Sequence, residues 1–278
     1  MAQMLFEVDM VGGAAGQAWK GAVGDIERDY PWDTLNAGDV SPAVAEVARK
    51  GWTENAFNEF CTGAAMGQML TLMTQANVPL DLMGMACAFP TEELLHVELC
   101  ARMAMRLGGG VPIVYDSDDL VLDIDDSETP LNQCNELIVR LLCVGEAFSL
   151  PMLTGAMDSA SHPLAKAVLR QIVKDEASHS RLGWLYLDWI ADDLAPGERE
   201  RLARCAESAI DEYREIWENI PEMGADDGIS GDPSLLALGW MAPSAYRTLA
   251  LKTVYSEIND QLAARGIHLR LDGAPQRA

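Results

Sequence analysis

The chain has 278 residues, 49% of them hydrophobic, and a formal net charge of −23 at pH 7. This composition suffices for one large domain, and the charge argues against nucleic acid or an anionic membrane as a partner, since phosphates would be repelled. No stretch approaches the roughly 20 uninterrupted apolar residues of a membrane span. The acidic N-terminal segment lacks the basic region of a signal peptide, and six scattered Cys without a Cys-x-x-Cys pair indicate reduced thiols, so we expect a cytoplasmic protein.

The first half of the chain predicts an irregular segment followed by helices. Residues 1–40 are rich in Gly and Asp and show no helical period, although 6–10 could form a short strand. Ser41 and Pro42 predict a helix start, with an end near Gly51 and a new helix capped by Thr53. Another helix is expected over about 80–107, where Pro90 either starts a segment or kinks it.

The second half predicts two further long helices and an additional C-terminal part. Residues 111–130 form an acidic loop whose spacing does not match a calcium-binding EF-hand. Helices follow at about 131–158, with a disturbance at Pro151, and at 163–194. Helices at 198–220 and 243–264, a loop at 221–232 and an extended or disordered tail complete the chain. We therefore expect an extension (1–40), a helical bundle (41–194) and additional helices that pack on it (195–278), all in one domain.

Two copies of one motif indicate a metal site. Glu93 is followed three residues later by His96, and Glu176 is followed in the same way by His179. Residues three apart on a helix project from one face, so each pair can hold a metal ion from one side. One copy would be a weak signal, but the chain has only four His and two of them carry this spacing.

A di-metal site in a helical bundle needs one more glutamate from each of two further helices. An antiparallel helix–loop–helix unit places these helices roughly 30 to 35 residues before each motif. Glu59 precedes Glu93 by 34 residues and Glu146 precedes Glu176 by 30, whereas Glu54 and Glu136 lie at longer offsets and are less favoured. Glu59 lies within an apolar stripe, where a metal would compensate its charge; the alternative is a place at the stripe's margin, in contact with water.

Two further acids are predicted to support the histidines. Glu92 and Asp175 directly precede the two motif glutamates. A ligating His usually donates its other ring N–H to a carboxylate, which fixes its tautomer. In an antiparallel bundle the natural pairing is crosswise, Asp175 with His96 and Glu92 with His179.

In these residues the sequence resembles the ferritin-like di-iron carboxylate superfamily, over about residues 45–190. The positions that match its E, ExxH, E, ExxH pattern are Glu59, Glu93, His96, Glu146, Glu176 and His179. The run DEASH is similar to the DExRH helix of bacterial multicomponent monooxygenases, with Ser178 in place of Arg. The resemblance implies an all-α, ferritin-like four-helix bundle with additional C-terminal helices. It also implies two iron ions, with a manganese–iron pair as the alternative, and O₂ as co-substrate.

The function that this resemblance favours is a di-iron oxidase or monooxygenase acting on a small organic metabolite by hydroxylation, desaturation or N-oxygenation. An external electron donor and a homodimer are further expectations. Cys100 stands where ribonucleotide reductase small subunits carry a radical-forming Tyr, and Ile172 where arylamine N-oxygenases carry an extra His, so neither subgroup is favoured. The rivals are a ferroxidase or rubrerythrin-like peroxide scavenger, and a non-enzymatic helical binding protein with a structural metal.

A substrate pocket is expected beside the ligands. Small residues would leave room there, leucines would make it apolar, and Pro151 either widens it or has no role. The candidates are Gly63, Met66, Cys100, Ser149, Leu150 and Leu153. For Cys100 the alternative is a small side chain that fills the core.

Overall fold

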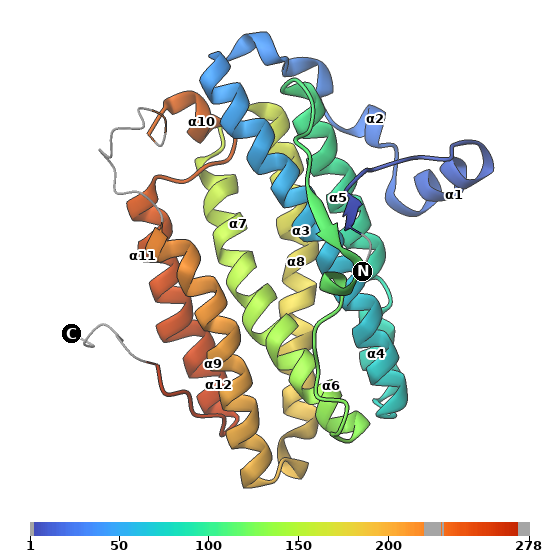
Figure 1. The fold of residues 1–278 in the computed structure, drawn as a ribbon, viewed down its shortest axis with the longest axis vertical. Coiled ribbons are helices and arrows are strands. Elements are labelled where there is room, and N and C mark those ends of the chain that lie inside the picture. Colours follow the sequence, from blue (N-terminus) through green and yellow to red (C-terminus); the bar gives the residue numbers. More distant parts are fainter. Residues whose placement is uncertain (1–2, 220–228, 230, 272–278) are drawn as a thin grey trace.

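The computed structural model describes residues 3–219, 229 and 231–271, and this part of the chain is helical almost throughout, which confirms the all-α class (Figure 1). Four long segments form its centre: α3 (Pro42–Gln75), α5 (Phe89–Arg106), the run of α6 (Pro130–Ile138), η4 (Val139–Glu146) and α7 (Ala147–Ser159), and α8 (Pro163–Ile190). Helix α3 packs on α5, α7 and η4 pack on α8, α3 contacts α6, and α5 contacts α8. Each segment therefore contacts two others.

Helix α3 is one continuous element of 34 residues, so the predicted break near Gly51 is wrong. Its start is as predicted, because the Ser41 hydroxyl accepts a hydrogen bond from the backbone N–H of Val44 and Pro42 occupies the first turn. Gly51 instead allows the ring of Trp240 to pack closely against α3, since a Cβ at this position would lie 2.5 Å from that ring. The glycine is thus required by packing against the C-terminal part of the chain.

The two prolines predicted to disturb helices have different outcomes. Pro90 lies in the first turn of α5, after the short helix α4 (Leu80–Ala86), so it starts the segment that carries the first motif. Pro151 lies inside α7 without ending it. The stretch just before α7 is π-helical from Val139 to Glu146, and such wider turns occur frequently at functional sites.

The N-terminal part contains more regular structure than its composition suggests. Strand β1 (Gln3–Leu5) pairs antiparallel with β2 (Val114–Asp116), so the short strand lies before residues 6–10. The other elements of this part are α1 (Gly13–Val23), α2 (Ile26–Asp29), η1 (Trp32–Thr34) and η2 (Ala37–Asp39), and η3 (Ser117–Leu120) follows β2.

The C-terminal helices lie along the α7 side of the centre (Figure 1). After η5 (Ala191–Asp193) they are α9 (Pro196–Asn219), α10 (Pro233–Ala237), α11 (Pro243–Lys252), η6 (Thr253–Ile258) and α12 (Asn259–Ala264). Most of the predicted loop at 221–232 and of the predicted tail lies outside the described residues.

One helical run among the described residues, Pro130–Ser159, is long and apolar enough to cross a membrane. Over half of its most apolar window is buried inside the protein. It also carries two buried acids, Glu136 and Glu146. These features are those of a helix in a protein core.

Candidate metal centre

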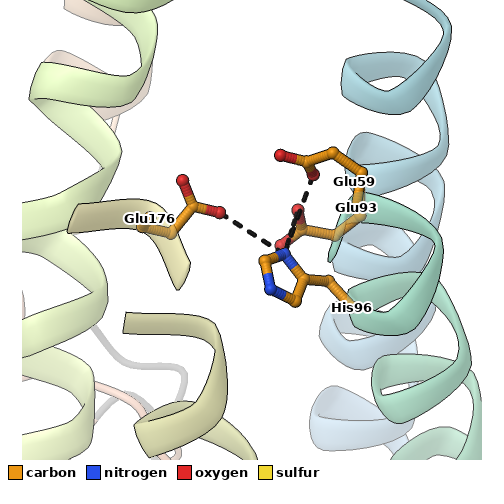
Figure 2. A group of neighbouring side chains, drawn as sticks. All are labelled: Glu59, Glu93, His96 and Glu176. Carbon is orange, nitrogen blue, oxygen red and sulfur yellow. Dashed lines mark ion pairs between the residues drawn. The ribbon is translucent and has the colours of Figure 1, made fainter. Parts of the chain in front are cut away.

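The structure brings all six predicted ligands together from four segments. Glu59 comes from α3, Glu93 and His96 from α5, Glu146 from the end of η4, and Glu176 and His179 from α8. Their ligand atoms form two groups, each with atoms within 4.8 Å of one another: Glu59, Glu93, His96 and Glu176, and Glu93, Glu146, Glu176 and His179. Figure 2 shows the first group, with Glu176 facing the other three. Two glutamates belong to both groups, so the groups are adjacent.

The two shared carboxylates each direct one oxygen to each imidazole. His96 Nδ1 lies 3.7 Å from Glu93 Oε2 and 3.4 Å from Glu176 Oε1. His179 Nδ1 lies 3.1 Å from Glu93 Oε1 and 3.1 Å from Glu176 Oε2. Glu59 completes one side, with its Oε2 3.5 Å from His96 Nδ1, and Glu146 completes the other. This geometry suits two neighbouring cations joined by two bridging carboxylates.

The outer nitrogens of the imidazoles have the predicted crosswise partners. His96 Nε2 lies 3.3 Å from Asp175 Oδ2, and His179 Nε2 lies 2.9 Å from Glu92 Oε2. Because a carboxylate accepts hydrogen bonds, each Nε2 donates and each Nδ1 faces the centre. Sequence reasoning missed Gln171, whose Nε2 donates to Asp175 Oδ2 at 2.7 Å. The signal was present, since an amide four residues before an acid shares its helix face.

Burial makes this cluster costly unless something satisfies its lone pairs. Glu93, His96 and His179 are fully buried and Glu176 is 2% exposed. Three of these buried atoms make no hydrogen bond within the described part of the chain: both carboxylate oxygens of Glu93, and His96 Nδ1. A buried unsatisfied polar group costs about 1–3 kcal/mol, and a charged one costs more. A cation between these atoms would remove that penalty, so the residues fit a metal pair.

The pKa shifts reflect four acids held close together. Burial raises the pKa of Glu59 to about 8, and burial beside Glu176 raises the pKa of Glu146 well above its usual range. Burial would also raise the pKa of Glu93, but the two imidazoles lower it to about 2. Burial opposes protonation of the imidazoles, yet the carboxylates raise the pKa of His96 strongly and that of His179 to about 12. A divalent cation would therefore displace protons from this cluster.

Two glycines allow the helices to approach at the level of the ligands. A Cβ on Gly63, one turn after Glu59, would lie 3.3 Å from Glu93 Cβ. A Cβ on Gly183, one turn after His179, would lie 2.8 Å from Leu142 Cβ on η4. The second contact is tighter than side chains tolerate, so Gly183 sets the distance between α8 and η4.

A cleft of about 160 Å³ lies beside the centre. Its lining includes Glu59, Glu146 and Glu176 together with Ser149 and Leu153, two of the six predicted pocket residues. Sequence reasoning missed the remaining lining, which is Asn55, Asn58, Thr62, Leu141, Gly145 and Tyr213. Tyr213 comes from α9, and no spacing within the motif-bearing helices could have indicated it.

The other four predicted pocket residues do not line this cleft. Met66 and Cys100 are buried in the apolar core, and Gly63 packs against Glu93. Leu150 lines a separate cavity with residues of α8 and η6. Ser149 and Leu153 are four apart and share a helix face, whereas Leu150 is turned away by about 100° from Ser149.

Comparison with protein-family models found no match, and comparison with curated proteins found no similar sequence. The structure by itself shows an all-α protein with a largely buried cluster of four glutamates and two histidines that could hold metal ions.

Proposed function

We propose that the chain is a di-iron oxidoreductase, an oxidase or monooxygenase that uses O₂ to oxidise a small organic molecule. The observation that carries the proposal is the pair of overlapping ligand groups that share Glu93 and Glu176. Hard oxygen donors with two imidazoles suit iron or manganese, whereas zinc sites use more sulfur and nitrogen.

The residues divide into terminal and bridging roles. Glu59 and His96 would hold one ion, Glu146 and His179 would hold the other, and Glu93 with Glu176 would bridge them. Four ionised carboxylates balance the charge of two ferrous ions, which permits such a pair inside an apolar core. When bound, the pair supplies two electrons to O₂.

The surrounding residues orient the ligands and restrict water. Asp175 and Glu92 hold the outer N–H groups of the two imidazoles. The ring of Phe89 lies 4.1 Å from that of His179, centroid to centroid, and closes one side. The 160 Å³ cleft reaches Glu59, Glu146 and Glu176 on another side. A substrate can thus approach the centre at both terminal glutamates and at one of the two shared glutamates.

The balance of the reaction requires an electron source. Monooxygenation transfers one oxygen atom of O₂ to the substrate and reduces the other to water, consuming two electrons and two protons from an external donor. A desaturation that removes two hydrogens from the substrate needs the same external pair to reduce O₂ fully to two waters. An electron donor is therefore part of the proposal.

The cleft favours this proposal over its two rivals. A ferroxidase or peroxide scavenger needs no organic site beside its metals, and a structural metal needs no access. Here an accessible cleft adjoins Glu59, whose side chain is 14% exposed while Glu93 is fully buried.

The test is metal analysis followed by reaction of the ferrous protein with O₂. We expect two iron ions per chain and a change in the optical spectrum when the anaerobic ferrous protein meets O₂. Glu93→Ala should lose the iron pair and the spectral change, whereas Glu215→Ala, which removes an exposed acid from α9, should retain the iron pair and the spectral change. A protein that binds no metal, or whose ferrous form does not react with O₂, would refute the proposal.

A further inference from the structure

A second, larger cavity adjoins the cleft. It has a volume of about 760 Å³ and lies between the first half of α3, α7 and the segment that includes α10 and the start of α11. Its apolar walls include Trp52, Met152, Trp240 and Tyr246. Asn55, Asn58 and Leu153 line both the cavity and the cleft. The two spaces therefore lie next to each other at these three residues, and the cleft reaches Glu59.

The size and lining of this cavity are those of a small-molecule site. Ligand sites in proteins enclose roughly 300–1,000 Å³ and combine apolar walls with a few polar groups. Trp52 and Trp240 form an edge-to-face pair at 6.2 Å between ring centroids, which holds the two rings in place and makes this wall rigid. Trp52 is 2% exposed, and its indole N–H has no acceptor among the residues described.

The charges around the cavity restrict what can enter it. The described residues that line the cavity include one acid, Glu54, and no Lys, Arg or His. Lys50 pairs with Glu54 at 3.7 Å, but its side chain is 62% exposed and it does not line the cavity. An anionic group within the cavity would be buried among apolar walls and beside Glu54 without a counter-ion, which is strongly unfavourable.

From these observations we infer that the cavity is the substrate site of the proposed oxidase and takes a hydrophobic molecule that bears no negative charge. This inference rests on the proposed function, because a molecule bound in the cavity is a substrate only if the adjoining centre oxidises it. The lining disfavours a carboxylate or phosphate ester group within the cavity. The apolar body of the molecule lies on Trp52 and Trp240, and the end to be oxidised passes Leu153 towards Glu59.

The test compares two probes that differ in charge and little else, octan-1-ol and octanoate. Binding to the full chain is followed at pH 7.5 and about 0.15 M salt by calorimetry and by tryptophan fluorescence. We expect octan-1-ol to bind at least about tenfold more tightly than octanoate, which corresponds to about 1.4 kcal/mol. Equal binding of the two probes, tighter binding of octanoate or no binding of octan-1-ol would overturn the inference.

Filling the cavity locates the binding. Ala156→Phe places a ring in the cavity from α7 and should weaken octan-1-ol binding at least about tenfold. Ala15→Phe adds the same ring to an exposed position of α1 and should leave binding unchanged. Val47→Trp narrows the cavity from α3 and serves if Ala156→Phe does not fold. Unchanged affinity in the folded cavity variants would overturn the inference.

The two proposals fail separately. If octan-1-ol binds as described but the protein holds no iron pair that reacts with O₂, the proposed function is wrong and the cavity remains a ligand site. If the iron pair reacts with O₂ but octan-1-ol does not bind, the inference is wrong and the proposed function stands.

Discussion

The contact at Gly183 predicts that a single methyl group disturbs both stability and metal loading. In Gly183→Ala the new Cβ would lie 2.8 Å from Leu142 Cβ and 2.9 Å from Cys143 Sγ. Carbon atoms in ordinary contact are about 3.5–4.0 Å apart, so η4 has to move away from α8 by several tenths of an ångström or more. Overpacking of this kind costs about 1–3 kcal/mol. Because η4 ends at Glu146, the same movement withdraws that carboxylate from Glu176 and His179.

The assay combines urea unfolding of the metal-free protein with metal stoichiometry. Gly183→Ala should lower the free energy of unfolding by about 1–3 kcal/mol and weaken binding of the ion held by Glu146 and His179. Gly67→Ala is the matched control, since its Cβ would meet nothing within 4 Å and its helical position should gain about 0.5–1 kcal/mol. A Gly183→Ala protein that is as stable as the parent and binds both ions equally well would refute the reasoning.

Three further predictions concern the ligands. Replacing either Glu93 or His179 by Ala should abolish loading of the metal pair while circular dichroism shows most helicity retained; two tightly held ions in both variants would contradict the assignment. Asp175→Asn should weaken metal binding about 10- to 100-fold in a metal titration. The control Lys174→Ala removes the exposed neighbour of Asp175 and should leave metal affinity unchanged. Equal metal affinities of Asp175→Asn and the parent protein would show that Asp175 does not support His96. Metal affinity should rise with pH between 6 and 8, by about tenfold per pH unit for each proton displaced. The reason is that the raised pKa values of His96 and His179 keep both imidazoles protonated until a cation displaces their protons. Calorimetry in buffers of different ionisation enthalpy measures this proton release, and a pH-independent affinity would contradict the prediction.

The candidate ligands were predictable from the sequence because helix geometry is local. A spacing of three residues determines that Glu93 and His96 share a face, and the length of a helix hairpin determines that Glu59 can reach them. The crosswise pairing of Asp175 with His96 needs one further premise, the antiparallel order of α5 and α8 in the expected bundle. The first two inferences use only distances along one helix or across one turn.

The parts that the sequence did not indicate depend on contacts between distant residues. Gly51 suggested a helix end, but its role is set by Trp240, which no local pattern connects to it. The cavity walls from Trp240 and Tyr246 have the same origin. The π-helical stretch before α7 was also absent from the prediction, so the face of α7 that meets the cleft could not be determined; Leu150, expected in the pocket, lines a separate cavity.

The most direct test of the metal centre is an anomalous difference map, measured at the iron absorption edge on crystals of the iron-loaded protein. The arrangement described above predicts two peaks per chain, both between Glu93 and Glu176, one beside His96 and the other beside His179. A single peak, or peaks away from these six side chains, would contradict it.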